Sequence, residues 1–292
     1  SENRGVLHSA LRDGAPRAPS QYRQAVAQTK QRLFTAVDDI RSGNWRGFTN
    51  KAIKDVVHIG IGGSHLGPEL VVKALAHLPG SANAPKLHFV ANIDANDIST
   101  ALVGLNPETT LFIVVSKSFG TLETQINAAT ARSWFLERTC NPQAIGQHFI
   151  GVTTNLEAAA QFGLKENNIF PLWDWVGGRF SLWSAVGLPI MLQIGTTAFD
   201  HLLAGANEAG EHFVKAPAEQ NIPLMSALMA TCHTTTLHCD SLEVLRYDER
   251  MALLHAILKQ MAMECQGKSA AMNGARECKQ QLKSWRGCGG IS

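Results

Sequence analysis

The stretch DVVHIGIGGSHLG, residues 55–67, decides the fold class of this chain. Residues 56–60 form a short apolar run typical of a buried strand, and a glycine-rich turn follows directly. A helical pattern begins at about Leu66 and continues to about His77. Because a strand that turns tightly into a helix opens a βαβ unit, the stretch predicts an α/β protein with a parallel sheet.

The alternation of apolar runs and helical patterns continues on both sides of this stretch. Further strands are expected at residues 87–90, 111–115 and 148–152. Helices are expected at residues 21–40, at 121–137, and from about residue 181 onward. The patterns divide the chain into an N-terminal helical segment (1–50), an α/β domain (51–200) and the helical start of a second domain (201–292).

Composition excludes several classes of protein. The 292 residues are 45% hydrophobic and 17% charged, enough for a substantial core. No apolar run approaches the roughly 20 residues that span a bilayer, and no apolar signal segment opens the sequence, so neither membrane partner nor secretion is expected. A net charge of +2 predicts no nucleic-acid partner, and six scattered cysteines indicate reduced thiols in a cytoplasmic protein. The missing initial Met fits a processed chain or a fragment.

The first candidate site is the glycine turn itself, residues 60–67. Its glycines let the main chain approach an anion, the following helix offers free N–H groups, and Ser64 adds a hydroxyl. A dinucleotide fingerprint would need glycine where His65 stands, which disfavours a nicotinamide-dependent dehydrogenase even though Asp94 follows the next strand. A tight turn without a ligand is the structural alternative.

The second candidate is SKSFGT, residues 116–121, at the carboxyl end of a predicted strand. The hydroxyls of Ser116, Ser118 and Thr121 and the ammonium of Lys117 could cradle a phosphate without a metal. The alternative is an ordinary helix cap.

The third candidate is DWVGGRFS, residues 174–181, where Arg179 could stabilise a developing oxyanion. The alternative is stacking of this arginine on nearby tryptophans.

The fourth candidate is Gln260 and Glu264, whose i,i+4 spacing places both on one helix face. Met261 and Met263 predict apolar surroundings for Glu264, as suits a general base. A solvated surface glutamate is the alternative.

A cluster of cysteines and histidines at 232–239 does not indicate a metal site. Cys232, His233, His238 and Cys239 match no zinc-ligand spacing. We therefore predict no metal in this protein.

Four segments, in this order, resemble the glucose-6-phosphate isomerase family. They are residues 60–69, 116–124, 174–184 and 247–268. The resemblance implies a sugar-isomerase (SIS-type) fold, a three-layer sandwich with a parallel sheet between helices. It also implies that the second lobe is incomplete within this sequence.

The resemblance implies a role for each matched residue. Those that would bind the phosphate of a hexose 6-phosphate are Ser64, Ser116, Lys117, Ser118 and Thr121, with the main chain of Gly63 and with Gln260. Arg179 would stabilise a cis-enediolate, and Glu264 would carry the proton between C1 and C2. No cofactor is implied, and a homodimer is expected.

Several positions depart from the family pattern. Gly120 lacks a usual hydroxyl, Arg246 replaces a proline, and Cys265 and Gln266 replace serine and asparagine after the glutamate. The family's ring-opening histidine and C-terminal lysine have no counterpart here, so these 292 residues are expected to isomerise poorly or not at all. A non-catalytic, SIS-type sugar-phosphate-binding regulatory module is the alternative. Residues 275–292 show no recognisable closing element.

Overall fold

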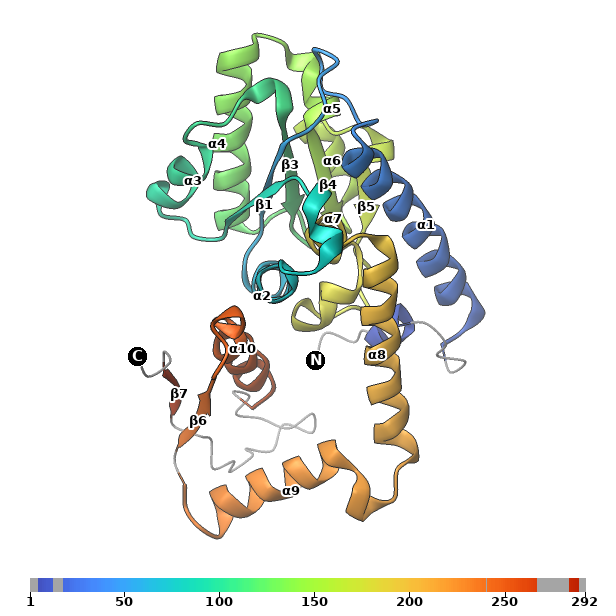
Figure 1. The fold of residues 1–292 in the computed structure, drawn as a ribbon, viewed down its shortest axis with the longest axis vertical. Helices are drawn as coiled ribbons and strands as arrows, with labels where there is room; N and C mark the ends of the chain where they lie inside the picture. Colours follow the sequence, from blue (N-terminus) through green and yellow to red (C-terminus); the bar gives the residue numbers. More distant parts are fainter. Residues whose placement is uncertain (1–4, 13–17, 240, 267–283, 289–292) are drawn as a thin grey trace.

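The computed structural model of the chain describes residues 5–12, 18–239, 241–266 and 284–288. A five-stranded parallel sheet with helices around it forms the larger part of the structure (Figure 1). The strands lie in the order β2-β1-β3-β4-β5. Their bounds are Asp55–Ile59 (β1), Lys86–Val90 (β2), Thr110–Val115 (β3), Phe149–Thr153 (β4) and Ile169–Pro171 (β5). The predicted α/β class is confirmed. The sequence pattern missed β5, whose three residues are too few to show a period.

Helices cover both faces of this sheet. They are α1 (Ser20–Ser42), α2 (Leu66–Leu75), α3 (Ala95–Leu102), α4 (Leu122–Thr139), α5 (Ile145–His148), α6 (Leu156–Phe162) and α7 (Leu188–Ile194). Helix α8 (Thr196–Lys215) packs on α1 and α7 and runs away from the sheet (Figure 1). The predicted helices at 21–40, 66–77 and 121–137 correspond to α1, α2 and α4.

Alternation along the central strand β3 gives each face its own core. Leu111, Ile113 and Val115 join a cluster that includes residues of α1 and α7, whereas Phe112 and Val114 join a cluster on α4. All six residues of β3 are buried, as expected for a parallel strand covered by helices on both faces. These two cores hold the ends of β1 and β3 firmly in place.

Beyond α8 the chain builds a second, smaller region. It contains α9 (Ile222–Thr235), β6 (Ser241–Leu245), α10 (Leu254–Gln266) and β7 (Ser284–Cys288), and β6 pairs with β7 in parallel. The expectation that the chain is wholly helical after residue 181, and that its end adds no regular element, is wrong at these two strands. Residues that pair between these two strands lie more than 40 positions apart in the chain, so neither strand carries a local signal of its partner. The rest of residues 275–292 lies outside the described residues.

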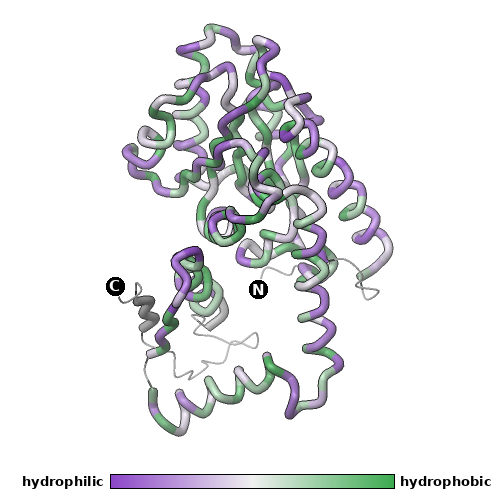
Figure 2. The backbone as a smooth tube through the Cα atoms, viewed as in Figure 1, coloured by the Kyte–Doolittle hydropathy of each residue, from purple (hydrophilic) through white to green (hydrophobic). Residues whose placement is uncertain are grey.

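Helix α9 is apolar but has no buried residue. Ile222, Leu228 and Met229 are 69%, 55% and 58% exposed, and Figure 2 shows hydrophobic residues along this helix. No described helix is both long enough and apolar enough to cross a membrane. The division into three parts at residues 50 and 200 stays a prediction.

Candidate active site

The loops that the sequence singles out meet at one edge of the sheet. The first loop (residues 60–67) follows the carboxyl end of β1, and the second loop (residues 116–121) follows the carboxyl end of the adjacent strand β3. Strand β2 lies on one side of β1 and β3 on the other, so the strand order reverses between β1 and β3. Ligands of open parallel sheets bind at such a switch point. The third loop (residues 174–181) follows β5. The 3₁₀ helix η7 (Gly178–Trp183), which begins in this loop, packs against the 3₁₀ helix η2 (Gly62–Ser64) of the first loop.

Close contact between the first and third loops requires glycine. A Cβ atom added at Gly63 would lie 2.1 Å from the Gly178 carbonyl oxygen and 2.7 Å from the main-chain nitrogen of Arg179. Gly62 has a φ of 58°, and a Cβ atom there would lie 2.8 Å from Gln260 Nε2. The two glycines therefore allow Arg179 and Gln260 to lie directly beside the first loop.

The second loop gathers its hydroxyls in front of α4. Ser116 Oγ donates to Thr121 Oγ1 at 3.3 Å, and Ser118 Oγ accepts a hydrogen bond from the Gly120 main-chain nitrogen at 3.2 Å. Phe119 between them has a φ of 52°, which is uncommon for a residue other than glycine. Helix α4 begins directly after Thr121, so its free N–H groups adjoin these hydroxyls.

Three polar residues at the end of β4, none of them singled out from the sequence, hold the main chain of the second loop. The hydroxyls of Thr153 and Thr154 donate to the Lys117 carbonyl oxygen at 3.0 and 2.6 Å. Asn155 Nδ2 donates to the Ser118 carbonyl oxygen at 3.2 Å. A polar Thr-Thr-Asn run directly after a predicted strand is the signal that could have found them.

The side chain of Lys117 links the second and third loops. Its Nζ donates to the carbonyl oxygens of Asp174 at 2.9 Å and Val176 at 3.1 Å, and lies 3.8 Å from the Asp174 carboxylate. The side chain is 28% exposed. A positive charge thus lies between the two loops and remains accessible to solvent.

An ion pair joins the third loop to α10. Arg179 Nη1 donates to Glu264 Oε2 at 2.7 Å, and Gln260 Nε2 donates to Glu264 Oε1 at 3.0 Å. Ile257 seats α10 against α2, since it is 8% exposed and a Cβ atom added at Gly67 would lie 3.5 Å from its Cδ1. A guanidinium, a carboxylate and an amide therefore converge at the edge where the loops meet.

The expected apolar surroundings of Glu264 are wrong. The Glu264 side chain is 42% exposed and Met263 is 48% exposed. Helical spacing determines which side chains share a face, but whether that face is buried depends on what packs against it. Here the Glu264 carboxylate contacts the charged Arg179 of the third loop and not an apolar environment.

Two histidines support the first loop from within the fold. His58 is fully buried in β1, and its Nε2 lies 2.7 Å from the Ser64 carbonyl oxygen. Because a carbonyl only accepts, this nitrogen carries the proton. Burial lowers the pKa of His58 to about 4, so the ring is neutral near pH 7. His65 Nε2 lies 3.0 Å from Glu69, and although burial raises the pKa of Glu69, hydrogen bonds from His65 and Lys73 bring it to about 2.

Comparison with known proteins identifies the family. The family profile described as phosphoglucose isomerase matches residues 1–285 of the sequence. The chain belongs to the phosphoglucose isomerase family. This confirms the resemblance seen in the four segments.

The curated relatives of this phosphoglucose isomerase family member are named glucose-6-phosphate isomerase. It is 46% identical over 277 residues to a glucose-6-phosphate isomerase of Paraburkholderia phytofirmans, covering 94% of this chain and 50% of that one. A glucose-6-phosphate isomerase of Burkholderia pseudomallei is also 46% identical, over 275 residues. The chain spans about half the length of the curated relatives it matches.

A solved structure agrees with the fold. The crystal structure of a glucose-6-phosphate isomerase from Chlamydia trachomatis superposes with a TM-score of 0.81 at 30% identity, covering 95% of this chain and 52% of that one. The SIS-type sandwich implied by the resemblance is thereby confirmed. The roles of the individual site residues stay predictions. Lys268, at the end of the fourth segment, lies outside the described residues.

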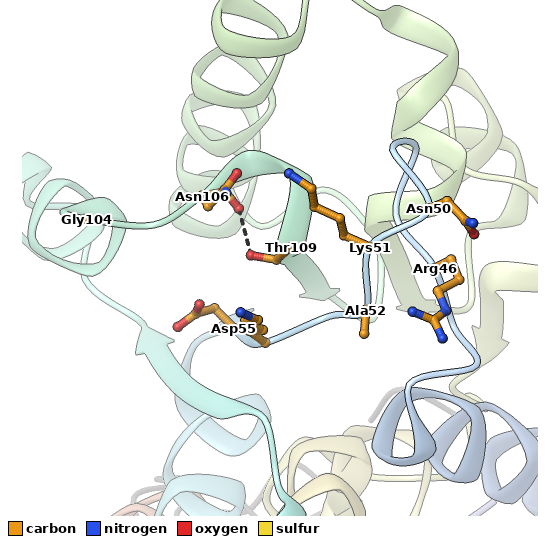
Figure 3. Close-up of a pocket in the computed structure, with 9 residues that line it drawn as sticks. Arg46, Asn50, Lys51, Ala52, Asp55, Gly104, Asn106 and Thr109 are labelled. Carbon is orange, nitrogen blue, oxygen red and sulfur yellow. Dashed lines mark hydrogen bonds between the residues drawn. The ribbon is translucent and has the colours of Figure 1, made fainter.

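A cavity of about 610 Å³ lies at the opposite edge of the sheet, near the amino ends of β1 and β3 (Figure 3). Its lining includes Arg46, Lys51 and Lys54, of which Lys51 forms an ion pair with Glu108. None of the predicted site residues lines it. Within the described part of the chain, no group of three or more His, Cys, Asp or Glu side chains could hold a metal ion.

Proposed function

We propose that this chain carries the substrate site of an isomerase that interconverts glucose 6-phosphate and fructose 6-phosphate, in glycolysis and gluconeogenesis. The Arg179–Glu264 contact of 2.7 Å, beside the glycine-rich first loop and the hydroxyl-rich second loop, is the observation that carries the proposal. Family membership supports the choice of reaction, because the relatives are named glucose-6-phosphate isomerases.

The phosphate of the substrate binds to the second loop. Hydroxyls of Ser116, Ser118 and Thr121, the N–H groups at the start of α4 and the ammonium of Lys117 together form a donor-rich, positively charged cradle. Ser64 and the main chain of Gly63 complete the cradle from the first loop. The side chains of Thr153, Thr154 and Asn155 hold its shape without touching the substrate.

Proton transfer takes place at Glu264. In the aldose-to-ketose direction its carboxylate removes the proton from C2, the electrons of that C–H bond form a C1=C2 double bond, and the carbonyl electrons move onto O1. Arg179 stabilises the negative charge of this cis-enediolate. A proton then passes from O2 to O1, the electrons on O2 form the new C2 carbonyl, and Glu264 returns its proton to C1. Every electron stays within the sugar, so the reaction balances without a redox partner.

Because Arg179 and Glu264 are paired, the charge that each can offer for catalysis depends on whether substrate is bound. Before binding, each neutralises the other across 2.7 Å. When an oxyanion develops near Arg179, the guanidinium gains a second anionic partner, and Glu264 becomes free to exchange its proton with carbon. Gln260 remains hydrogen-bonded to the other carboxylate oxygen and keeps Glu264 oriented.

A coupled assay of fructose 6-phosphate conversion to glucose 6-phosphate, with calorimetric titration of fructose 6-phosphate, tests this function. We expect saturable binding, with conversion that is slow, because the histidine and lysine implied by the resemblance are not among these residues. Glu264→Gln should abolish conversion and retain binding, while Glu219→Gln on an exposed 3₁₀ helix should change neither. Binding without any conversion would mean that these 292 residues keep the phosphate site without the chemistry, and saturable NAD binding would favour a dehydrogenase.

We also propose that the protein is cytoplasmic and works as a homodimer, as the resemblance implies. Light scattering coupled to size-exclusion chromatography tests the second point. A species of twice the mass of this 31.6 kDa chain is expected, and a monomer at micromolar concentration would contradict it.

A further inference from the structure

The N-terminal segment of the chain reaches the candidate site from outside the sheet. The 3₁₀ helix η1 (His8–Leu11) packs against η7, and the Leu7 main-chain nitrogen donates to the Trp175 carbonyl oxygen at 3.2 Å. Ala10 and Leu11 are 7% and 3% exposed and belong to the core on that face of the sheet. Segment η1 is therefore anchored beside the third loop, which carries Arg179 and lies about 170 residues later in the sequence.

His8 and Arg179 share one aromatic ring. The imidazole of His8 stacks on Phe180 with ring centroids 4.4 Å apart and planes inclined by 12°. The guanidinium carbon of Arg179 lies 4.9 Å from the centroid of the same ring. Phe180 thus lies in contact with both His8 of η1 and Arg179, the residue that pairs with Glu264.

We propose that His8 is a positioning residue, which holds Arg179 in place by stacking on Phe180. The inference rests on the proposed function, because it assigns a supporting residue to the same site. An arginine side chain has many rotamers, and a guanidinium that stabilises a transition state must be held within a fraction of an ångström. The ion pair with Glu264 fixes one end of Arg179, and the stacked ring limits where the guanidinium plane can lie.

The surroundings of His8 favour its neutral form. Its Nδ1 is buried and has no hydrogen-bond partner among the described residues, so a proton there would find no acceptor. Burial, followed by the positive charges of Arg12 and Arg179, lowers the pKa of His8. A neutral ring can stack on Phe180 without repelling Arg179, as a second cation at this position would.

Paired substitutions at His8 test the inference. His8→Ala removes the stacked ring, His8→Phe keeps a ring without a titratable nitrogen, and Ser9→Ala alters an exposed neighbour on the same 3₁₀ helix. We expect His8→Ala to lower kcat for fructose 6-phosphate about tenfold with KM changed less than about twofold, because Arg179 acts mainly in the transition state. His8→Phe should restore most of kcat, and Ser9→Ala should match the unaltered chain.

A second measurement separates this inference from the proposed function. The NMR resonance of the Arg179 Nε–H group, identified by its loss in Arg179→Lys, reports the arginine without any turnover. We expect this resonance to move or broaden in His8→Ala and to stay in place in His8→Phe. If the unaltered chain shows no conversion, the proposed function fails while the resonance still decides the role of His8. An unmoved resonance in His8→Ala, or equal damage by His8→Phe, would overturn the inference.

Discussion

At the scale of single residues, glycine contacts are the sharpest constraint on the site. Gly63 and Gly178 face each other, yet only Gly63 lacks room, because a Cβ atom there would lie 2.1 Å from a carbonyl oxygen whereas one at Gly178 meets nothing within 4 Å. We predict that Gly63→Ala lowers the free energy of unfolding by about 1–3 kcal/mol through overpacking, and that Gly178→Ala changes it by less than about 0.5 kcal/mol. Urea unfolding of the two variants checks this, and equal effects would contradict it.

His58 predicts a dependence of stability on pH. Its folded-state pKa of about 4 lies below the 6.5 of an unperturbed histidine. As pH falls from 6.5 toward 4, the unfolded chain takes up a proton that the folded chain refuses, so stability drops by roughly 3 kcal/mol over that window. His148, whose pKa burial also lowers, adds a loss of the same sign.

The variant His58→Phe isolates the histidine contribution. Its free energy of unfolding should fall less steeply between pH 6.5 and 4 than that of the unaltered chain. Parallel curves for the two proteins in urea titrations across this range would show that His58 does not carry the effect.

At the scale of elements, the docking of α10 decides whether the carboxylate reaches the arginine. Ile257 is 8% exposed against α2, whereas Met263 on the same helix is 48% exposed. Ile257→Ala should lower the free energy of local unfolding of α10 by roughly 2–5 kcal/mol and weaken the Arg179–Glu264 pair. Met263→Ala should lower this free energy far less. Hydrogen exchange of the α10 amides measures this. Equal protection in both variants would mean that α10 is held by other contacts.

Local patterns predicted those elements that carry their own signal. Strands β1, β3 and β4 are continuous apolar runs, and α1 and α4 are long periodic helices. Strand β5 is too short to show a period, and β6 and β7 become strands only by pairing with each other. The hydroxyls and charged groups of the site were visible because loops after parallel strands share one edge. The Thr-Thr-Asn run at 153–155 is visible in the sequence, but its contacts with the Lys117 and Ser118 carbonyl oxygens depend on tertiary packing, as does the exposed setting of Glu264.

At the scale of the whole molecule, stability is unevenly distributed. The sheet is covered on both faces, but α9 exposes Leu228 and Met229 and buries none of its residues. We predict that amides of β3 exchange only through global unfolding, whereas amides of α9 exchange orders of magnitude faster. Hydrogen exchange with mass spectrometry tests this, and equally slow exchange in α9 would show that this helix is covered in solution.

Deuterium incorporation shows whether Glu264 moves a proton on a hexose 6-phosphate. Fructose 6-phosphate is incubated with the protein in heavy water, and the proton NMR signals of C1 of the ketose and C2 of the aldose are followed for hours. This detects proton transfer even when net turnover is slow. We predict incorporation with the unaltered chain and none with Glu264→Gln, although both bind the sugar phosphate. Saturable binding with no incorporation by the unaltered chain, or incorporation that survives Glu264→Gln, would contradict this prediction.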